Sequence, residues 1–105
     1  MSKTMNKVEV LKAVETILQL RFITLTAYTQ MNDPRTVHVR IGDISVIEEQ
    51  PDDSRKEYKV GIALRCYPDK VMLLKDTYDQ IIKRIDDVRH EIYEEIISDA
   101  KEQEK

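Results

Sequence analysis

Basic and aromatic side chains recur at alternate positions in two segments that are typical of β-strands. His38 and Arg40 lie in one segment, and Arg65 and Tyr67 lie in the other. Alternate residues of a strand share one face of its sheet. Arginine offers a planar fork of donors for phosphate oxygens, and tyrosine offers a ring on which a base can stack. The pattern suits an anionic ligand with a flat ring, and the alternative is the solvated face of a two-layer domain, which carries the same residue types.

A third candidate lies where the last expected strand meets the last expected helix. Lys75 and Thr77 stand at this junction, and Thr77 with Gln80 forms a capping box of the type S/T-x-x-Q. This motif typically starts a helix, and a helix start presents N–H groups that suit an anion. Lys75 and Thr77 are therefore candidate ligand-binding residues, and plain capping of the helix is the alternative.

No group of side chains has the spacing of a catalytic site or a metal site. Asp86 and Asp87 are neighbours on an expected helix, where adjacent side chains diverge by about 100° and do not converge on one point. Cys66 lies in an apolar segment, which suits a buried thiol better than a nucleophile. One cysteine and two histidines without clustered spacing do not predict a zinc site. The sequence predicts a protein that is not an enzyme and that holds no metal and no cofactor.

Charge is spread unevenly along the chain. The net charge is −3, and from Asp76 onward ten acidic residues stand against five basic ones, a net −5, which leaves +2 for residues 1–75. A mildly basic sheet region suits a small anionic ligand better than a nucleic acid wrapped around the whole domain. We therefore expect no DNA or RNA partner.

The length of 105 residues predicts one domain, 1–105, with a single modest core. No run of about 18 apolar residues occurs, so we expect no membrane-spanning helix and no membrane partner. Charged residues follow the basic N-terminus too closely for a signal-peptide apolar region. The expected location is the cytoplasm.

Hydrophobic periodicity predicts an α+β fold, a small antiparallel sheet of about five strands with an N-terminal helix and a long C-terminal helix. Apolar residues recur at helical spacing in 6–20 and in 77–100, and they alternate within 22–75. Turns are expected at 31–35 and 68–70, with a polar hairpin tip at 51–57, so that the last two strands cover 58–67 and 71–75.

The strand expected at 58–67 has two contrasting faces. Its core face is expected to carry Val60, Ile62, Leu64 and Cys66. Gly61 and Ala63 on the other face have almost no side chain, which would leave room for a flat ligand to approach the backbone beside Arg65 and Tyr67.

The apolar stripe of the C-terminal helix continues further than one small sheet can cover. Each turn advances about 5.4 Å, and the stripe runs on through Val88, Ile92 and Ile96. Excess apolar surface on a protruding helix indicates a partner, either the N-terminal helix or another copy of the chain. We expect a homo-oligomer, with Val88, Ile92 and Ile96 at its interface.

The order of these segments resembles that of two protein families. The resemblance lies in Phe22–Thr26, Val37–Glu49, Val60–Leu64 and Val71–Ile82, about two thirds of the chain. Small FlbD-like flagellar proteins have a strand ending in Leu-Thr, a strand leading into Ile-x-x-Ile-Glu-Glu, and a Val-Lys-Glu-Ser entry into the last helix, which the Leu-Lys-Asp-Thr of residues 74–77 is similar to. Phage proteins of the Thoeris anti-defence 1 family look similar in order and add a longer C-terminal helix.

The resemblance to the phage family implies sequestration, without hydrolysis, of an immune signal that is a cyclic ADP-ribose isomer or a cyclic oligonucleotide. Carried over to this chain, it makes Tyr67 a stacking partner for adenine and puts Thr77 at the ligand-facing start of a helix. Arg40 and Arg65 would contact the pyrophosphate, on the basis of side-chain parity. The resemblance to the flagellar family implies the alternative, a small oligomeric interaction module that binds no small ligand.

Overall fold

The chain forms two helices and a five-stranded antiparallel sheet, which confirms the predicted α+β fold. The computed structural model describes residues 6–29, 31, 33–49 and 59–103, so the expected hairpin tip at 51–57 lies outside the described residues. The elements follow in the order α1 (Lys7–Leu18), β1 (Phe22–Tyr28), β2 (Pro34–Arg40), the short 3-10 helix η1 (Ile41–Asp43), β3 (Ile44–Glu49), β4 (Val60–Leu64), β5 (Tyr67–Leu74) and α2 (Tyr78–Gln103).

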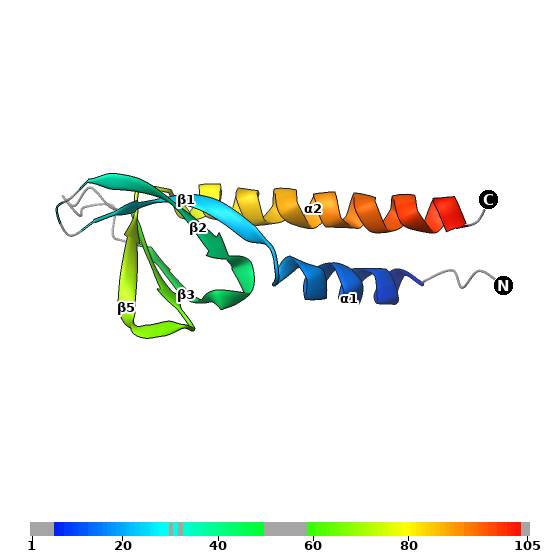
Figure 1. Ribbon diagram of the computed structural model, residues 1–105, viewed down its shortest axis with the longest axis horizontal. Coiled ribbons are helices and arrows are strands. Elements are labelled where there is room, and N and C mark those ends of the chain that lie inside the picture. Colours follow the sequence, from blue (N-terminus) through cyan, green and yellow to red (C-terminus); the bar gives the residue numbers. More distant parts are fainter. Residues whose placement is uncertain (1–5, 30, 32, 50–58, 104–105) are drawn as a thin grey trace.

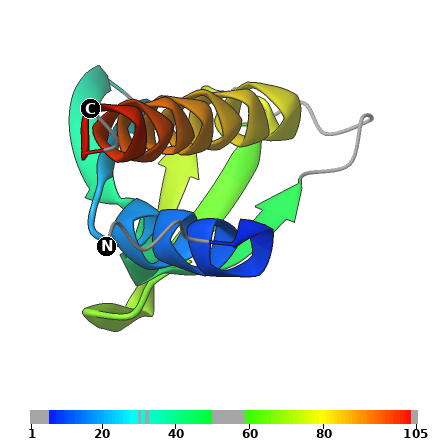
Figure 2. The ribbon, with the colours of Figure 1, turned by 90° about the vertical axis from the view of Figure 1, so that its right-hand side faces the viewer.

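The two helices run antiparallel to each other and extend away from the sheet. Figure 1 shows them side by side, with both ends of the chain at the same end of the molecule, and Figure 2 looks along the pair. The molecule measures 59 × 24 × 21 Å. With 26 residues α2 is about 39 Å long, so it reaches well beyond the sheet. Beyond the sheet, its neighbour is α1.

The sheet consists of two parts that meet beside the start of α2. Its strand order is β2-β1-β5-β4-β3, with antiparallel neighbours throughout. β1 and β2 pair along their full length, whereas the register joins β1 to β5 at one pair, Ala27 with Leu74. The β1–β2 ribbon therefore diverges from the β3–β5 sheet on either side of that contact.

Alternation along the strands places their apolar residues on one face, as predicted for β1 and for Val60 and Ile62 of β4. The resulting core cluster contains Ile23, Leu25, Ala27, Val39, Val60, Ile62, Leu74 and Ile81. Ile81 belongs to the first turns of α2, so the first half of this helix covers the sheet.

The hairpin between β4 and β5 turns earlier than the sequence predicted. The chain turns at Arg65 and Cys66, and the expected turn at 68–70 lies inside β5. Pro68 is accommodated because it stands near the start of a strand, where a missing N–H interrupts the ladder least. Cys66 is exposed, so its expected burial on the core face was wrong. A residue in a turn no longer follows the alternation of the strand before it.

The space beside Gly61 is filled by the protein itself. Gly61 is buried, and a Cβ atom at this position would lie 3.0 Å from Cγ1 of Val71. Val71 also pairs with Ala63 across the β4–β5 ladder. The expected opening for a flat ligand beside Gly61 and Ala63 was therefore wrong, because Val71 covers that part of β4.

A second apolar cluster joins the two helices. On α1 the buried residues are Val10, Val14 and Leu18. They pack against Ile92 of α2, which is 1% exposed, and Val88 and Ile96 are partly buried against the same cluster. The long apolar stripe of α2 is thus covered within one chain by α1, which was one of the two partners that the sequence left open.

Candidate ligand-binding site

The residues predicted to bind a ligand lie in three separate places. They are His38 and Arg40 on β2, Arg65 and Tyr67 at the β4–β5 turn, and Lys75 and Thr77 before α2. Tyr67 pairs with Leu64 and Leu74 pairs with Val60, four residues apart on β4, which is about 13 Å along the strand. Tyr67 and Lys75 line two different hollows, so these residues do not form one site.

On the exposed face of the β1–β2 ribbon, His38 and Arg40 contact side chains of the neighbouring strand. His38 Nδ1 lies 3.2 Å from the Thr24 hydroxyl, and the Arg40 guanidinium lies 5.5 Å from the centre of the Phe22 ring. Each contact joins residues that are direct partners in the β1–β2 register. They are typical of cross-strand pairs that stabilise a sheet, and they account for both residues without a ligand.

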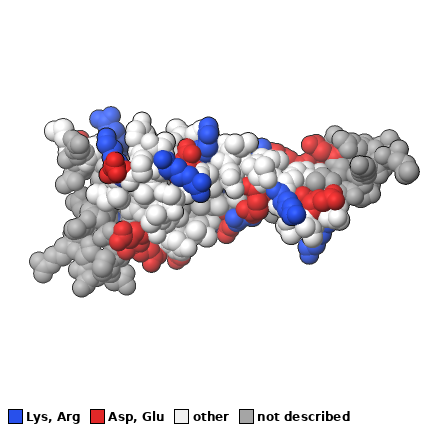
Figure 3. Space-filling model, turned by 90° about the horizontal axis from the view of Figure 1, so that it is seen from below, with Lys and Arg blue, Asp and Glu red and all other residues white. Residues whose placement is uncertain are grey.

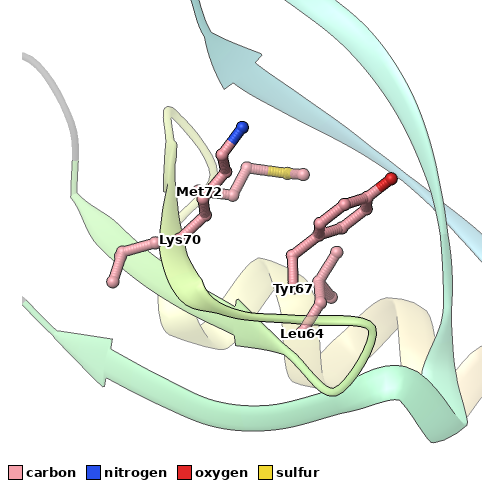
Figure 4. A pocket seen from close by; sticks show the side chains of 5 residues that line it. Leu64, Tyr67, Lys70 and Met72 are labelled. Atoms are coloured by element: carbon pink, nitrogen blue, oxygen red, sulfur yellow. The ribbon is translucent and has the colours of Figure 1, made fainter.

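Tyr67 lines an apolar pocket, here called the tyrosine pocket, under the β4–β5 hairpin. It has a volume of about 210 Å³ and is lined by Leu64, Tyr67, Lys70, Val71 and Met72. Figure 4 shows the Tyr67 ring beside Leu64, with Met72 and Lys70 across from it. The Lys70 ammonium lies 6.0 Å from the centre of the ring. The tyrosine pocket could hold a flat apolar group but offers one cation, and Arg65 is not among the residues that line it.

Lys75 and Thr77 line a second hollow, here called the cationic hollow, where the two parts of the sheet meet α2. Its volume is about 450 Å³ and its lining residues are Thr26, Tyr28, Lys59, Lys75, Asp76, Thr77, Gln80 and Arg84. Three of these side chains are cationic and one is a carboxylate. An aromatic ring, hydroxyl groups and one amide group complete the lining, and these residue types suit the recognition of a phosphate and a base.

Asp76 and Arg84 form a clasp that closes the gap between β1 and α2. The Thr26 N–H donates to Asp76 Oδ2 at 2.6 Å, and Arg84 Nη1 donates to the Thr24 carbonyl at 3.0 Å. Arg84 also pairs with Asp76 Oδ1. The Thr26 N–H and the Thr24 carbonyl are backbone groups on the β5 side of β1, where β5 no longer pairs with β1. The side chains of Asp76 and Arg84 therefore supply the hydrogen-bond partners that a neighbouring strand would otherwise provide. The Asp76 side chain is 4% exposed, and its charge is balanced by Arg84.

The clasp determines the electrostatics of the cationic hollow. Arg84 is held in place by two acceptors, Asp76 and the Thr24 carbonyl, so its guanidinium is ordered before any ligand arrives. Because Asp76 is engaged by Arg84 and by the Thr26 N–H, its charge is balanced locally. The two lysines of the hollow, Lys59 and Lys75, then supply the positive charge that an anion would meet.

Lys59 and Lys75 are brought together by the β4–β5 ladder. Val60 pairs with Leu74, and the Lys59 N–H donates to the Leu74 carbonyl at 2.9 Å. Both lysines are exposed and both line the cationic hollow. Like charges placed together across neighbouring strands are destabilising. A bound anion would remove that repulsion, so the register itself favours an anionic ligand here.

Thr77 starts α2 through the predicted capping box. The Gln80 N–H donates to Thr77 Oγ1 at 3.2 Å, and the Thr77 N–H donates to Gln80 Oε1 at 3.0 Å. These two bonds satisfy backbone N–H groups that a helix start leaves without helical partners. The hydroxyl of Thr77 acts as the acceptor in its bond, so its own proton is not used by the cap.

Sequence reasoning missed Lys59, Arg84 and Tyr28 as lining residues of the cationic hollow. Lys59 could have been found by extending the β4–β5 register one residue past Val60 once the turn was placed correctly. Arg84 lies eight residues after Asp76, about two helical turns. This spacing can be read from the sequence, but it predicts an ion pair only once both side chains are known to bind the backbone of β1. Tyr28 is brought to the hollow by the single β1–β5 contact.

Further groups in the described part of the chain add no metal site and no membrane element. No three His, Cys, Asp or Glu side chains in residues 6–29, 31, 33–49 and 59–103 come close enough to hold a metal ion. None of the helices in these ranges is both long and apolar enough to cross a membrane.

Comparisons of the chain with models of known families, with curated proteins and with solved structures give no match.

Proposed function

We propose that the protein captures a phosphate-bearing nucleotide signal in the cationic hollow, without covalent chemistry. The observation that carries the proposal is the placement of Lys59, Lys75 and Arg84 in one hollow whose carboxylate is engaged by Arg84. The ligand class is the one that the phage-family resemblance implies, a cyclic ADP-ribose isomer or a cyclic oligonucleotide. The protein would act as a nucleotide sponge in the cytoplasm of a phage-infected cell.

The distribution of cations suits a ligand with more than one phosphate oxygen to bind. Arg84 is fixed by its clasp, whereas Lys59 and Lys75 are exposed and free to adjust along flexible stems. A pyrophosphate could bridge between the two lysines and the guanidinium, and the Thr77 hydroxyl could donate to it. Tyr28, which lines the same hollow, offers a ring face to a base.

The chemistry of the lining residues supports capture rather than turnover. The residues described around the cationic hollow include no histidine and no cysteine, and Asp76 is paired with Arg84. A hydroxyl becomes a nucleophile only with a base placed beside it. Bound nucleotide should therefore leave the protein chemically unchanged.

The test is a capture-and-release experiment. Purified protein is incubated with the nucleotide mixture that a TIR enzyme makes from NAD, washed, and heated, and the released nucleotide is identified by mass spectrometry. We expect intact cyclic nucleotide in stoichiometric amounts from the wild type and much less from Lys59→Gln/Lys75→Gln. Equal release from both proteins would overturn the assignment to the cationic hollow, and a hydrolysed product formed repeatedly would overturn the non-enzymatic function.

A second candidate function is a protein-interaction module, and one observation favours it. Val46, Ala63 and Val71 follow one another across β3, β4 and β5, and both valines are exposed. Exposed apolar side chains that are contiguous across strands are typical of a surface that binds another protein. This candidate predicts that no nucleotide is released from the wild type in the same experiment.

A further inference from the structure

Helix α1 is apolar on two sides, although α2 covers one of them. Val10, Val14 and Leu18 face α2 and are buried. Val8 and Leu11 lie on another side of the helix and are 59% and 50% exposed. A helix that packs against one neighbour needs one apolar stripe, so this second pair of apolar residues is not explained by the fold of a single chain.

The exposed apolar residues of α1 belong to a continuous hollowed surface, here called the α1 face. One hollow is lined by Val8, Leu11, Lys12, Glu15 and Thr16. Leu11 and Glu15 also line the adjoining groove between the helices, whose other wall includes His90 and Tyr93 of α2. The α1 face therefore extends over α1 and into the groove beside it.

The charges on the α1 face are arranged so that two copies of this face can attract each other. Lys7, Leu11 and Glu15 follow at intervals of four residues, so they share one side of the helix. Glu15 pairs with Arg89 of its own chain at 2.8 Å, and Arg89 also pairs with Asp86, so these three side chains together carry one net negative charge. In an antiparallel copy centred on Leu11, Lys7 of one chain lies opposite this acidic group of the other, and the reverse pair forms on the other side of the centre. Figure 3 views the molecule from below, the side on which α1 lies in Figure 1, and the helical end shows basic and acidic side chains interspersed with uncharged ones. Such a face repels neither itself nor a partner of the same composition.

We infer that the α1 face binds a second copy of this chain, with the two α1 helices antiparallel and Leu11 near the two-fold axis. A two-fold interface uses the same patch on both copies, which the pairing of Lys7 with Glu15 satisfies. The dimer surface is distinct from Val88, Ile92 and Ile96, which pack against α1 within the chain. The inference does not depend on the proposed function, because the cationic hollow lies at the opposite end of α2.

The size of the α1 face predicts a weak dimer. Twelve residues of α1 extend over about 18 Å, and two helices side by side are about 20 Å wide, so the projected face is about 360 Å². Stable complexes bury about 800 Å² on each partner. Association should therefore depend on protein concentration, with monomer and dimer both present in the micromolar range.

The experiment is sedimentation velocity of the full chain from about 1 µM to about 1 mM. The wild type should shift from monomer to dimer, and Val8→Glu/Leu11→Glu should remain a monomer throughout. Both replaced residues are exposed, so circular dichroism should show an unchanged fold. Leu20→Glu is the matched control, because Leu20 is an exposed apolar residue outside α1, and it should dimerise like the wild type. A wild type that stays monomeric, or a double variant that still dimerises, would overturn the inference.

A charge exchange tests the antiparallel arrangement. Lys7→Glu alone and Glu15→Lys alone should each weaken self-association by about tenfold, since each places like charges together at both ends of the interface. An equimolar mixture of the two variants should dimerise more tightly than either variant alone, because an acidic side chain at position 7 of one chain would then face a basic side chain at position 15 of the other. Recovery to the wild-type level is not required, because Glu15→Lys also removes the ion pair of Glu15 with Arg89. If the mixture associates no better than the single variants, while Val8→Glu/Leu11→Glu still abolishes dimerisation, the antiparallel arrangement is wrong.

Discussion

Replacing Asp76 by alanine should destabilise the whole protein, although the residue belongs to neither apolar cluster. The change removes the acceptor of the Thr26 N–H and the partner of Arg84. A hydrogen bond to a charged group contributes about 1.5–3 kcal/mol, and a buried donor left without a partner adds about 1–3 kcal/mol. The Arg84 side chain is 41% exposed, so it can turn to water and its ion pair counts for little. We expect a loss of about 3 kcal/mol in the free energy of unfolding.

Urea unfolding followed by circular dichroism measures this loss. The midpoint should fall while the slope stays that of the wild type, since the surface exposed on unfolding is unchanged. A loss of about 3 kcal/mol corresponds to a fall in melting temperature of roughly 15 °C for a chain of this size. Asp87→Ala is the control, because Asp87 forms an exposed ion pair with Lys83 and should change stability by less than about 0.5 kcal/mol. If Asp76→Ala behaves like Asp87→Ala, the clasp does not hold β1 against α2.

Four further substitutions test the two apolar clusters and the turn between β2 and β3. Ile62→Ala should lower the free energy of unfolding by about 2–5 kcal/mol in the same titration, because Ile62 is fully buried. Leu64→Ala, at a half-buried position, should lower it clearly less. Equal losses in the two variants would contradict the burial pattern of β4. Ile92→Glu should abolish cooperative unfolding of the helix pair and reduce its circular dichroism signal, because it places a charge against α1, and wild-type stability would refute the packing of α1 on α2. Gly42→Ala should lower the melting temperature in calorimetry, because its Cβ would lie 2.6 Å from the Gln19 carbonyl oxygen; an unchanged melting temperature would show that this contact is not tight.

Features set by neighbouring residues could be predicted from the sequence. Thr77 and Gln80 lie within one helical turn, and they form the hydrogen bonds expected of a capping box. The cap of α1 is equally local, because the Glu9 N–H donates to Asn6 Oδ1. The alternation that buries Leu25 is equally local, because it depends only on the period of a strand. For the same reason the number of strands and their succession along the chain followed from the pattern.

Features set by contacts between distant segments could not be predicted. The turn at Cys66 depends on how β4 and β5 align, and the sequence signal of Pro68 suggested a turn too far along the chain. The clasp of Asp76 and Arg84 exists because β5 leaves β1 after one pair at Ala27, a fact that no local pattern contains. Of the residues that line the cationic hollow, the sequence therefore indicated Lys75 and Thr77. It did not indicate Lys59 and Arg84, because their positions depend on the register of the sheet and on the placement of α2.

The central claim, that the cationic hollow holds the ligand, is tested most directly by calorimetric titration with cyclic ADP-ribose and with a cyclic dinucleotide. Four proteins are compared: the wild type, Lys59→Gln/Lys75→Gln, Tyr67→Ala, and the control Lys70→Gln, which removes a lysine outside the cationic hollow. The double lysine variant should lose affinity by more than tenfold, as expected for charge-assisted contacts of about 1.5–3 kcal/mol each. Tyr67→Ala and Lys70→Gln, which alter the tyrosine pocket at the other end of β5, should bind like the wild type. Loss of affinity in these two variants with no loss in the double lysine variant would place the ligand in the tyrosine pocket and contradict the account.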